Sequence, residues 1–246
     1  MSSPTEAFHQ RNARMIQKMG QDRELEQRTH NWFEQASKYE YSYHFTWMGR
    51  PIIQFPQDMV ALQEIIWETR PQLIVETGVA HGGSLIFHAS LLELIGGNGR
   101  VLGIDIDIRP HNRAAIESHP MFKRIILAEG SSTAPEMQSV ARQMAADCER
   151  VMVILDSNHT HEHVRAELDL YGSLVTRGCY LVVLDTIIDR MGEAFSNDRP
   201  WGPGRSPLTA VQEFLKTSNR FVLNSEIDNK LLITVAPGGY LKCIKD

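Results

Sequence analysis

Two stretches of this chain combine residue types that bind a nucleoside. Residues 73–84 run from an apolar segment into an acid, Glu76, and then into a turn containing Gly78, Gly82 and the glycine after it. The next apolar segment ends at a second acid, Asp105. A strand, a glycine-rich turn, a helix and a strand ending in an acid hold adenosine-containing ligands at the carboxyl edge of a parallel sheet. The glycines let the backbone approach the ligand, and Asp105 can accept hydrogen bonds from two ribose hydroxyls.

The details of this turn favour one adenosine ligand. The dinucleotide pattern G-x-G-x-x-G is absent, which disfavours a pyrophosphate cradle and an NAD-dependent oxidoreductase. Glu76 ahead of the turn suits a cationic ligand better than an anionic one. S-adenosylmethionine carries an ammonium and a sulfonium group, so the turn predicts this cofactor. His81 and Ser84, within and just after the turn, are candidate contacts for it.

Two later apolar segments also end in acids, Asp156 and Asp185. Because the carboxyl ends of parallel strands converge on one crevice, we expect both acids to lie near Asp105. Their oxygens are suitable ligands for Mg²⁺, and Asp156 is also expected to border the cofactor. The turn after a third segment contains Gly130 and Ser131, which we expect to face the adenine.

A histidine-rich sequence follows Asp156. His159 lies three residues further on, which would place an imidazole beside the metal, where it could deprotonate a substrate hydroxyl. The alternative is a helix-terminal histidine bonded to the backbone, with His161 or His163 as the base. Zinc binding by all three is disfavoured, because only His159 and His163 share a helical face.

The remaining pattern predicts an α/β fold. Apolar segments alternate with helical ones, as expected for strands covered on both faces. The last two strands have a short connection, which predicts an antiparallel hairpin at the sheet edge. We therefore expect a Rossmann-like class I methyltransferase: a seven-stranded, mostly parallel sheet with a C-terminal antiparallel hairpin. The predicted strands are residues 73–76, 101–106, 123–128, 151–156, 178–185, 220–224 and 232–236.

The N-terminal residues 1–48 and the loop 199–207 do not follow this alternating pattern. We expect residues 1–48 to form a helical N-terminal extension or cap and residues 49–246 to form the methyltransferase domain. The extension would pack on the domain, pack on a second subunit in a homo-oligomer, or form a lid. Its aromatic end, residues 39–47, fits either a buried connector or one wall of a substrate pocket. The loop 199–207 is either a lid that presents Trp201 to a ring-shaped substrate or a surface loop with Trp201 in the core.

Composition excludes several classes of protein. The chain has 246 residues and a net charge of −5 without a long basic run, so no nucleic-acid partner is expected. Cys148, Cys179 and Cys243 show no paired spacing and fit reduced thiols. No signal peptide and no membrane span are evident. These features predict a cytoplasmic protein.

Several of these motifs together resemble the cephalosporin hydroxylase and rhamnosyl O-methyltransferase family, a branch of the class I S-adenosylmethionine-dependent methyltransferases. The similarity extends from about residue 40 to the C-terminus. The resemblance implies a methyltransferase that binds S-adenosylmethionine through Glu76, Gly78 and Asp105. The matching segments are residues 47–58, 75–84, 103–112, 155–163 and 199–204.

The resemblance also implies Mg²⁺ at Asp156 and Asp185 and a base at His159. Related enzymes carry an acidic pair at the second metal position, where this chain has Leu184 and Asp185. Thr186, Asp189 or water would then complete the metal shell. No two-histidine, one-carboxylate iron site is evident, so the oxidation suggested by the family name is discounted.

The implied reaction is O-methylation of a small-molecule or glycan acceptor. The resemblance favours a sugar hydroxyl in the biosynthesis of a glycosylated natural product or polysaccharide. The alternatives are a catechol-like or antibiotic hydroxyl, and a non-catalytic partner subunit that retains the fold.

Overall fold

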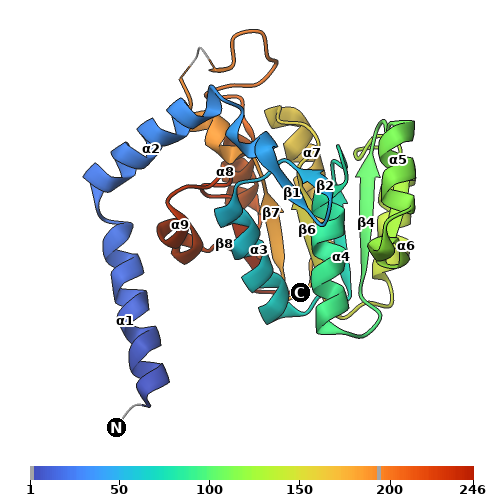
Figure 1. Cartoon of the computed structure of the whole chain (residues 1–246), viewed down its shortest axis with the longest axis horizontal. Helices are drawn as coiled ribbons and strands as arrows, with labels where there is room; N and C mark the ends of the chain where they lie inside the picture. The colour runs from blue at the N-terminus through green and yellow to red at the C-terminus, as the bar shows by residue number, and fades with distance from the viewer. Residues whose placement is uncertain (1–2, 193–194) are drawn as a thin grey trace.

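A sheet forms the centre of the protein (Figure 1). Its seven strands run in the order β5-β4-β3-β6-β7-β9-β8. The computed structural model describes residues 3–192 and 195–246. Strands β3 to β7 are parallel, whereas β9 is antiparallel to both β7 and β8. The strands are β3 (Leu73–Thr77), β4 (Arg100–Asp105), β5 (Ile125–Glu129), β6 (Val151–Leu155), β7 (Tyr180–Val183), β8 (Phe221–Leu223) and β9 (Tyr240–Cys243).

Helices connect the strands, and a small antiparallel ribbon precedes them. The ribbon pairs β1 (Phe45–Trp47) with β2 (Arg50–Ile52). Short 3₁₀ helices are η1 (Tyr41–His44), η2 (Pro120–Arg124) and η3 (Thr186–Arg190). The α-helices are α1 (Pro4–Met19), α2 (Arg23–Ser37), α3 (Pro56–Thr69), α4 (Gly83–Ile95), α5 (Pro110–Glu117), α6 (Pro135–Ala145), α7 (His161–Gly172), α8 (Pro207–Thr217) and α9 (Ser225–Leu231).

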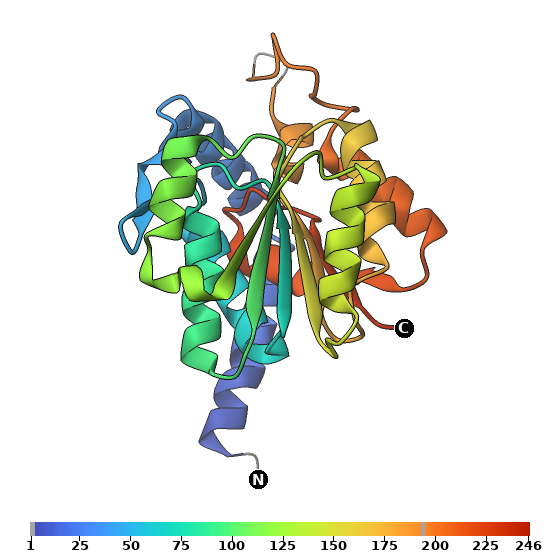
Figure 2. The ribbon, with the colours of Figure 1, turned by 90° about the vertical axis from the view of Figure 1, so that its right-hand side faces the viewer.

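Helices cover both faces of the sheet (Figure 2). Helices α3, α4 and α5 contribute to the core on one face, and α6, α7 and α8 to the core on the other. Every residue of β3 and β6 is buried. This explains why these strands are continuous apolar runs, since alternation is expected only where one face meets water.

The expected fold is confirmed, but the last predicted strand was wrong. Residues 225–231 form helix α9, and β9 begins only at Tyr240. Residues 232–236 instead cross the core as a loop, where Val235 and Ala236 are buried. The terminal strands are thus antiparallel neighbours joined through a helix, not by a hairpin turn. A short apolar run indicates burial, but it does not separate a strand from a buried loop.

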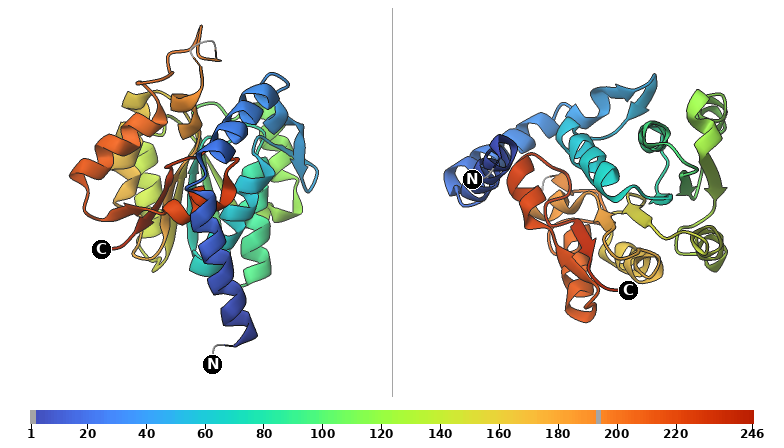
Figure 3. Two further views of the ribbon diagram at one scale, coloured as in Figure 1. Left: turned by 90° about the vertical axis from the view of Figure 1, so that its left-hand side faces the viewer. Right: turned by 90° about the horizontal axis from the view of Figure 1, so that it is seen from below.

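The N-terminal segment is helical, as expected, and only part of it packs on the domain. Helix α2 buries Phe33, whose ring stacks on Phe55 with centroids 4.8 Å apart. Helix α1 buries no residue and reaches past the body of the protein beside α9 (Figure 3). Within the described residues, no helix is long and apolar enough to cross a membrane.

A buried carboxyl joins α3 to the loop before β9. Asp58 is fully buried and accepts hydrogen bonds from the Val235 amide at 2.9 Å and the Tyr240 hydroxyl at 2.7 Å. The Thr234 hydroxyl also donates to it. Burial raises the pKa of Asp58 to about 6, although these donors oppose the rise. Removing the carboxylate from water thus outweighs its three hydrogen bonds.

Replacing Asp58→Asn is expected to change how stability depends on pH. Because its pKa is raised from 3.8 to about 6 in the folded state, ionised Asp58 disfavours folding. The wild type should lose up to about 3 kcal/mol of stability relative to the variant as pH rises from about 4 to 6, with little further change above. Urea unfolding of both proteins across this range measures the difference, and other carboxyls cancel in it. A relative gain for the wild type with rising pH would contradict this assignment.

Candidate active site

Three predicted site residues meet at the carboxyl edge of the sheet. Asp156 follows β6, His159 lies in the next loop, and Asp185 follows the neighbouring strand β7. One ligand atom of each lies within 4.8 Å of those of the other two. Nε2 of His159 is 3.3 Å from Oδ2 of Asp185. Adjacent parallel strands therefore bring together acids that are far apart in the sequence.

The electrostatics of this cluster suit a divalent cation. Burial, followed by the charges of Asp185, Glu76 and Glu167, raises the pKa of Asp156 well above its ordinary value. A cation between the carboxylates would offset this repulsion. Two carboxylates match the preference of Mg²⁺ for oxygen ligands, and a single histidine does not make the two-histidine iron site.

The second metal position differs from the expected set. Asp185 adopts a left-handed backbone conformation, with φ of 55°. Leu184 stands where related enzymes carry an acidic residue. Its side chain is buried in the hydrophobic core and cannot bind a metal. The buried Thr186 hydroxyl donates to the Pro237 carbonyl at 2.9 Å, and is thus engaged with the main chain. Asp189 accepts from Ser206 Oγ at 2.8 Å and anchors the following loop.

The glycine turn lies directly against the Asp156, His159 and Asp185 cluster. Gly78 has a φ of +94°, and a Cβ there would lie 2.1 Å from the carbonyl oxygen of Asp156. At Gly83, a Cβ would lie 2.1 Å from the carbonyl oxygen of Pro51. Only glycine permits these close backbone approaches. The turn therefore joins the ends of β3 and β6 to β2.

Side chains from three elements hold the turn in place. Arg50 donates to the His81 carbonyl from Nε at 3.1 Å and to Asn112 Oδ1 at 3.2 Å. Asn112 in turn donates to the Ala80 carbonyl at 2.9 Å. Oδ2 of Asp105 accepts from the Val79 amide at 2.7 Å. Asp105, expected to bind ribose, thus also supports the turn.

Glu76 is more enclosed than the sequence suggested. It is buried, and one carboxylate oxygen accepts from the Ser84 hydroxyl. Its other oxygen lies 3.0 Å from Nε2 of buried His88, without the geometry of a hydrogen bond. Two expected cofactor contacts, Glu76 and Ser84, are therefore bonded to each other beneath the turn.

The remaining cofactor candidates surround the same edge. His81 and Gly82 line a cleft together with Asp156. The Gly130 amide donates to the Asp105 carbonyl at 2.8 Å, so the turn after β5 lies beside the end of β4. Ser131 Oγ is 3.0 Å from Thr133 Oγ1. A larger cleft between α2 and α9 contains none of the expected site residues.

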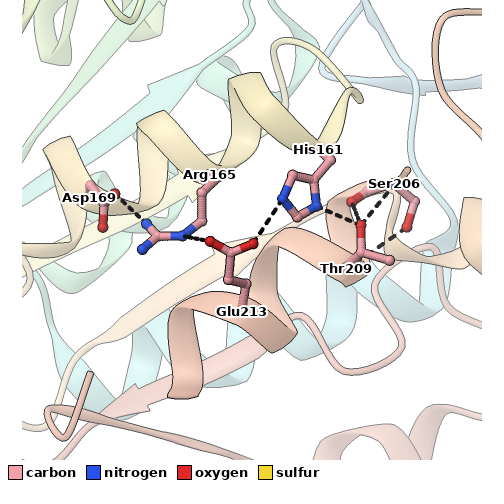
Figure 4. Close-up of polar contacts among 6 residues, drawn as sticks. All are labelled: His161, Arg165, Asp169, Ser206, Thr209 and Glu213. Atoms are coloured by element: carbon pink, nitrogen blue, oxygen red, sulfur yellow. Dashed lines mark hydrogen bonds and ion pairs between the residues drawn. The ribbon is translucent and has the colours of Figure 1, made fainter. Parts of the chain in front are cut away.

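The other two histidines of the motif lie in separate hydrogen-bonding networks. Nδ1 of His161 is 2.8 Å from Thr209 Oγ1, and its Nε2 is 3.1 Å from Glu213, which joins α7 to α8 (Figure 4). Nε2 of His163 is 3.0 Å from Ser132 Oγ, which links α7 to the turn after β5. A three-histidine zinc site is thus excluded.

The loop 199–207 brings an aromatic ring to the cluster. The Trp201 ring packs edge-on against His159, with centroids 5.8 Å apart. Gly204 and Ser206 donate to Asp189, which ties the loop to η3. Trp201 is partly exposed beside the candidate base, not tucked into the core. The aromatic segment 39–47 follows α2 and includes β1. Tyr39 in it is exposed, whereas Tyr41 packs on Phe55.

Sequence patterns missed the supports of the site. Arg50 and Asn112 lie in segments that carried the family resemblance, but periodicity and spacing assigned them no contact. Arg50 begins strand β2 and Asn112 lies in the first turn of α5, each within two residues of a proline. Their backbone partners, the carbonyls of His81 and Ala80, are 31 and 32 residues away, and the two side chains bond to each other across 62 residues. Local sequence does not encode such pairings.

The fold and this edge define a class I S-adenosylmethionine-dependent methyltransferase. The family model Rhamnosyl O-methyltransferase/CmcI matches residues 39–244, and the chain belongs to that family of O-methyltransferases. The chain is 31% identical over 205 residues to rhamnosyl O-methyltransferase of Mycobacterium bovis, covering 80% of this chain and 77% of that protein. It is 36% identical over 172 residues to that of Mycobacterium leprae, covering 69% of each.

Solved structures share the fold. The apo structure of CmcI aligns with a TM-score of 0.57 and 20% identity, over 83% of this chain and 78% of CmcI. CmcI with Mg and S-adenosylmethionine aligns at 0.55 and 19%, over 82% and 77%. A Bacillus cereus O-methyltransferase in complex with S-adenosylhomocysteine aligns at 0.53 and 16%, over 88% and 90%.

The contact at Gly78 should be required for both stability and cofactor binding. Gly78→Ala would push the turn away from Asp156, in addition to the strain of an alanine at positive φ. Gly97→Ala is a matched control, since Gly97 has a φ of +73° but nothing within 4 Å. We expect the control to cost about 1–2 kcal/mol and Gly78→Ala to cost more.

Chemical unfolding and S-adenosylhomocysteine titration measure the two effects. Only Gly78→Ala should weaken binding. Equal stability losses and equal affinities for the two variants would show that the contact with Asp156 does not matter.

Proposed function

We propose that this enzyme transfers a methyl group from S-adenosylmethionine to a sugar hydroxyl, with Mg²⁺ assisting. One observation carries the proposal: the Asp156, His159 and Asp185 cluster lies directly against the glycine turn. A cofactor on the turn and an acceptor on the cluster would therefore be neighbours. Holding two reactants in this way can supply much of the rate enhancement.

The cofactor would lie across the ends of β5, β4, β3 and β6. Asp105 would accept from the ribose through its remaining lone pairs, and the turn after β5 would border the adenine. Glu76 would act on the cationic end from beneath the turn, with Ser84 fixing its carboxylate. The proposed contacts are Glu76, Gly78, His81, Gly82, Ser84, Asp105, Gly130, Ser131 and Asp156.

The metal would be held by Asp156 and Asp185. Thr186 or water would complete the shell, because the Thr186 hydroxyl gives its proton to the Pro237 carbonyl and keeps oxygen lone pairs for a cation. When bound, Mg²⁺ would orient adjacent acceptor oxygens and lower the pKa of the hydroxyl.

His159 is the proposed general base. Its Nε2 faces Asp185, which can orient the imidazole and stabilise its protonated form. The acceptor hydroxyl would give its proton to His159 as the oxygen takes the methyl group in line and S-adenosylhomocysteine leaves. His161 and His163 are bonded to Thr209, Glu213 and Ser132, so they are poorly placed for this role.

The acceptor would be a sugar with neighbouring hydroxyls, in a glycosylated natural product or polysaccharide. Trp201 offers a flat apolar face beside His159, which suits a sugar ring. The names of the rhamnosyl O-methyltransferases with which the chain shares 31% and 36% identity also favour a sugar. A catechol-like hydroxyl is the second candidate, because the same cluster would fit any vicinal diol.

We also propose that residues 1–48 form an extension that joins subunits into a homo-oligomer. Helix α1 buries no residue, and its large apolar side chains Phe8 and Met15 are 60% and 50% exposed. A second subunit could cover this apolar surface. Sedimentation of the whole chain would test this, and a monomer at all concentrations would contradict it.

Replacing His159→Gln should abolish most turnover and leave cofactor binding intact. The amide keeps a polar group of similar reach but cannot accept a proton at neutral pH, so a loss of about 10²–10⁴-fold in kcat is expected. Methyl transfer is measured with a panel of rhamnosides, other vicinal-diol glycosides and catechols, and S-adenosylhomocysteine affinity by calorimetry.

His161→Gln is the matched control. It changes the same residue type on the adjoining helix, within the network that joins α7 to α8, and should retain activity. Full activity of His159→Gln, or an equal loss in both variants, would remove His159 as the base.

A further inference from the structure

A buried amide lines the cleft beside the glycine turn. Gln54 lies between β2 and α3, and the close contact between Gly83 and Pro51 brings its segment against the turn. The cleft is lined by residues 51–54, residues 78–84 and Asp156. The cleft is small, about 40 Å³, and opens to solvent.

The polar atoms of Gln54 are unused. The side chain is 2% exposed, and among the described residues neither its Oε1 nor its Nε2 has a hydrogen-bond partner. A buried amide without partners destabilises the fold. Gln72 shows the usual arrangement, since its Oε1 accepts from the Glu149 amide at 2.7 Å. An amide kept in this state points to a ligand that supplies its missing partners.

Several polar groups of the glycine turn are already engaged. The carbonyls of Ala80 and His81 accept from Asn112 and Arg50, and the Ser84 hydroxyl donates to Glu76. Gln54 therefore offers free hydrogen-bonding capacity at this end of the cleft. The nucleoside candidates lie at the ends of β4 and β5, whereas Gln54 shares the cleft with Asp156 after β6.

We propose that Gln54 binds the amino-acid end of the cofactor, with Nε2 donating to its carboxylate and Oε1 accepting from its ammonium group. One carboxamide carries both the donor and the acceptor that such a zwitterion requires. The assignment rests on the proposed cofactor, and it makes Gln54 a binding residue that the sequence motifs did not indicate.

The test compares two ligands on Gln54→Met. S-adenosylhomocysteine carries the amino-acid end, and 5′-methylthioadenosine has the same nucleoside and sulfur without it. Gln54→Met should weaken S-adenosylhomocysteine about tenfold or more and leave methylthioadenosine within about twofold. The melting temperature of the free variant should stay equal or rise, because an unpaired amide is removed.

Two further variants complete the design. Gln54→Glu keeps the size but replaces the donor by a negative charge, so it too should weaken only S-adenosylhomocysteine. Gln72→Met removes an amide that is bonded, and should lower the melting temperature without changing either affinity. Equal losses for both ligands, or none for either, would overturn the role of Gln54. Failure of the wild type to bind both ligands would instead refute the proposed function.

Discussion

The approach of Gly78 to the backbone of Asp156 is the constraint on which the site depends. A Cβ at Gly78 would lie 2.1 Å from that carbonyl oxygen, so only glycine lets the ends of β3 and β6 meet. This contact places the turn expected to hold the cofactor directly beside the Asp156, His159 and Asp185 cluster. The other residues of the site hold the glycine turn and this cluster in fixed positions relative to each other.

Polar side chains from several elements hold the glycine turn in place. Arg50 and Asn112 donate to the carbonyls of His81 and Ala80, and Asp105 accepts from the amide of Val79. Beneath the turn, Glu76 is enclosed by Ser84 and His88. The turn is thus held on both sides, as expected where a ligand must be bound in one orientation.

Local sequence predicted the strands whose ends carry chemistry, because apolar runs ending in acids are distinctive in a parallel sheet. It therefore brought Asp156, His159 and Asp185 together correctly. It failed at residues 232–236, where an apolar run is buried as a loop held by Asp58. It also missed Arg50, whose partners lie far away in the sequence, and Gln54, whose buried amide has no partner among the described residues. Leu184 shows a further limit. The sequence shows that an expected acidic residue is absent, but only the structure shows that the leucine side chain packs in the core.

Calorimetric titration with S-adenosylhomocysteine, in Mg²⁺ and again after chelation, tests the central claim most directly. The proposed cofactor turn and metal site, in contact with each other, predict micromolar binding in both conditions, with affinity or heat of binding changed by Mg²⁺. Binding that is indifferent to Mg²⁺ would contradict the metal at Asp156 and Asp185 and leave His159 as a metal-free base. No binding in either condition would contradict the whole account of this edge of the sheet.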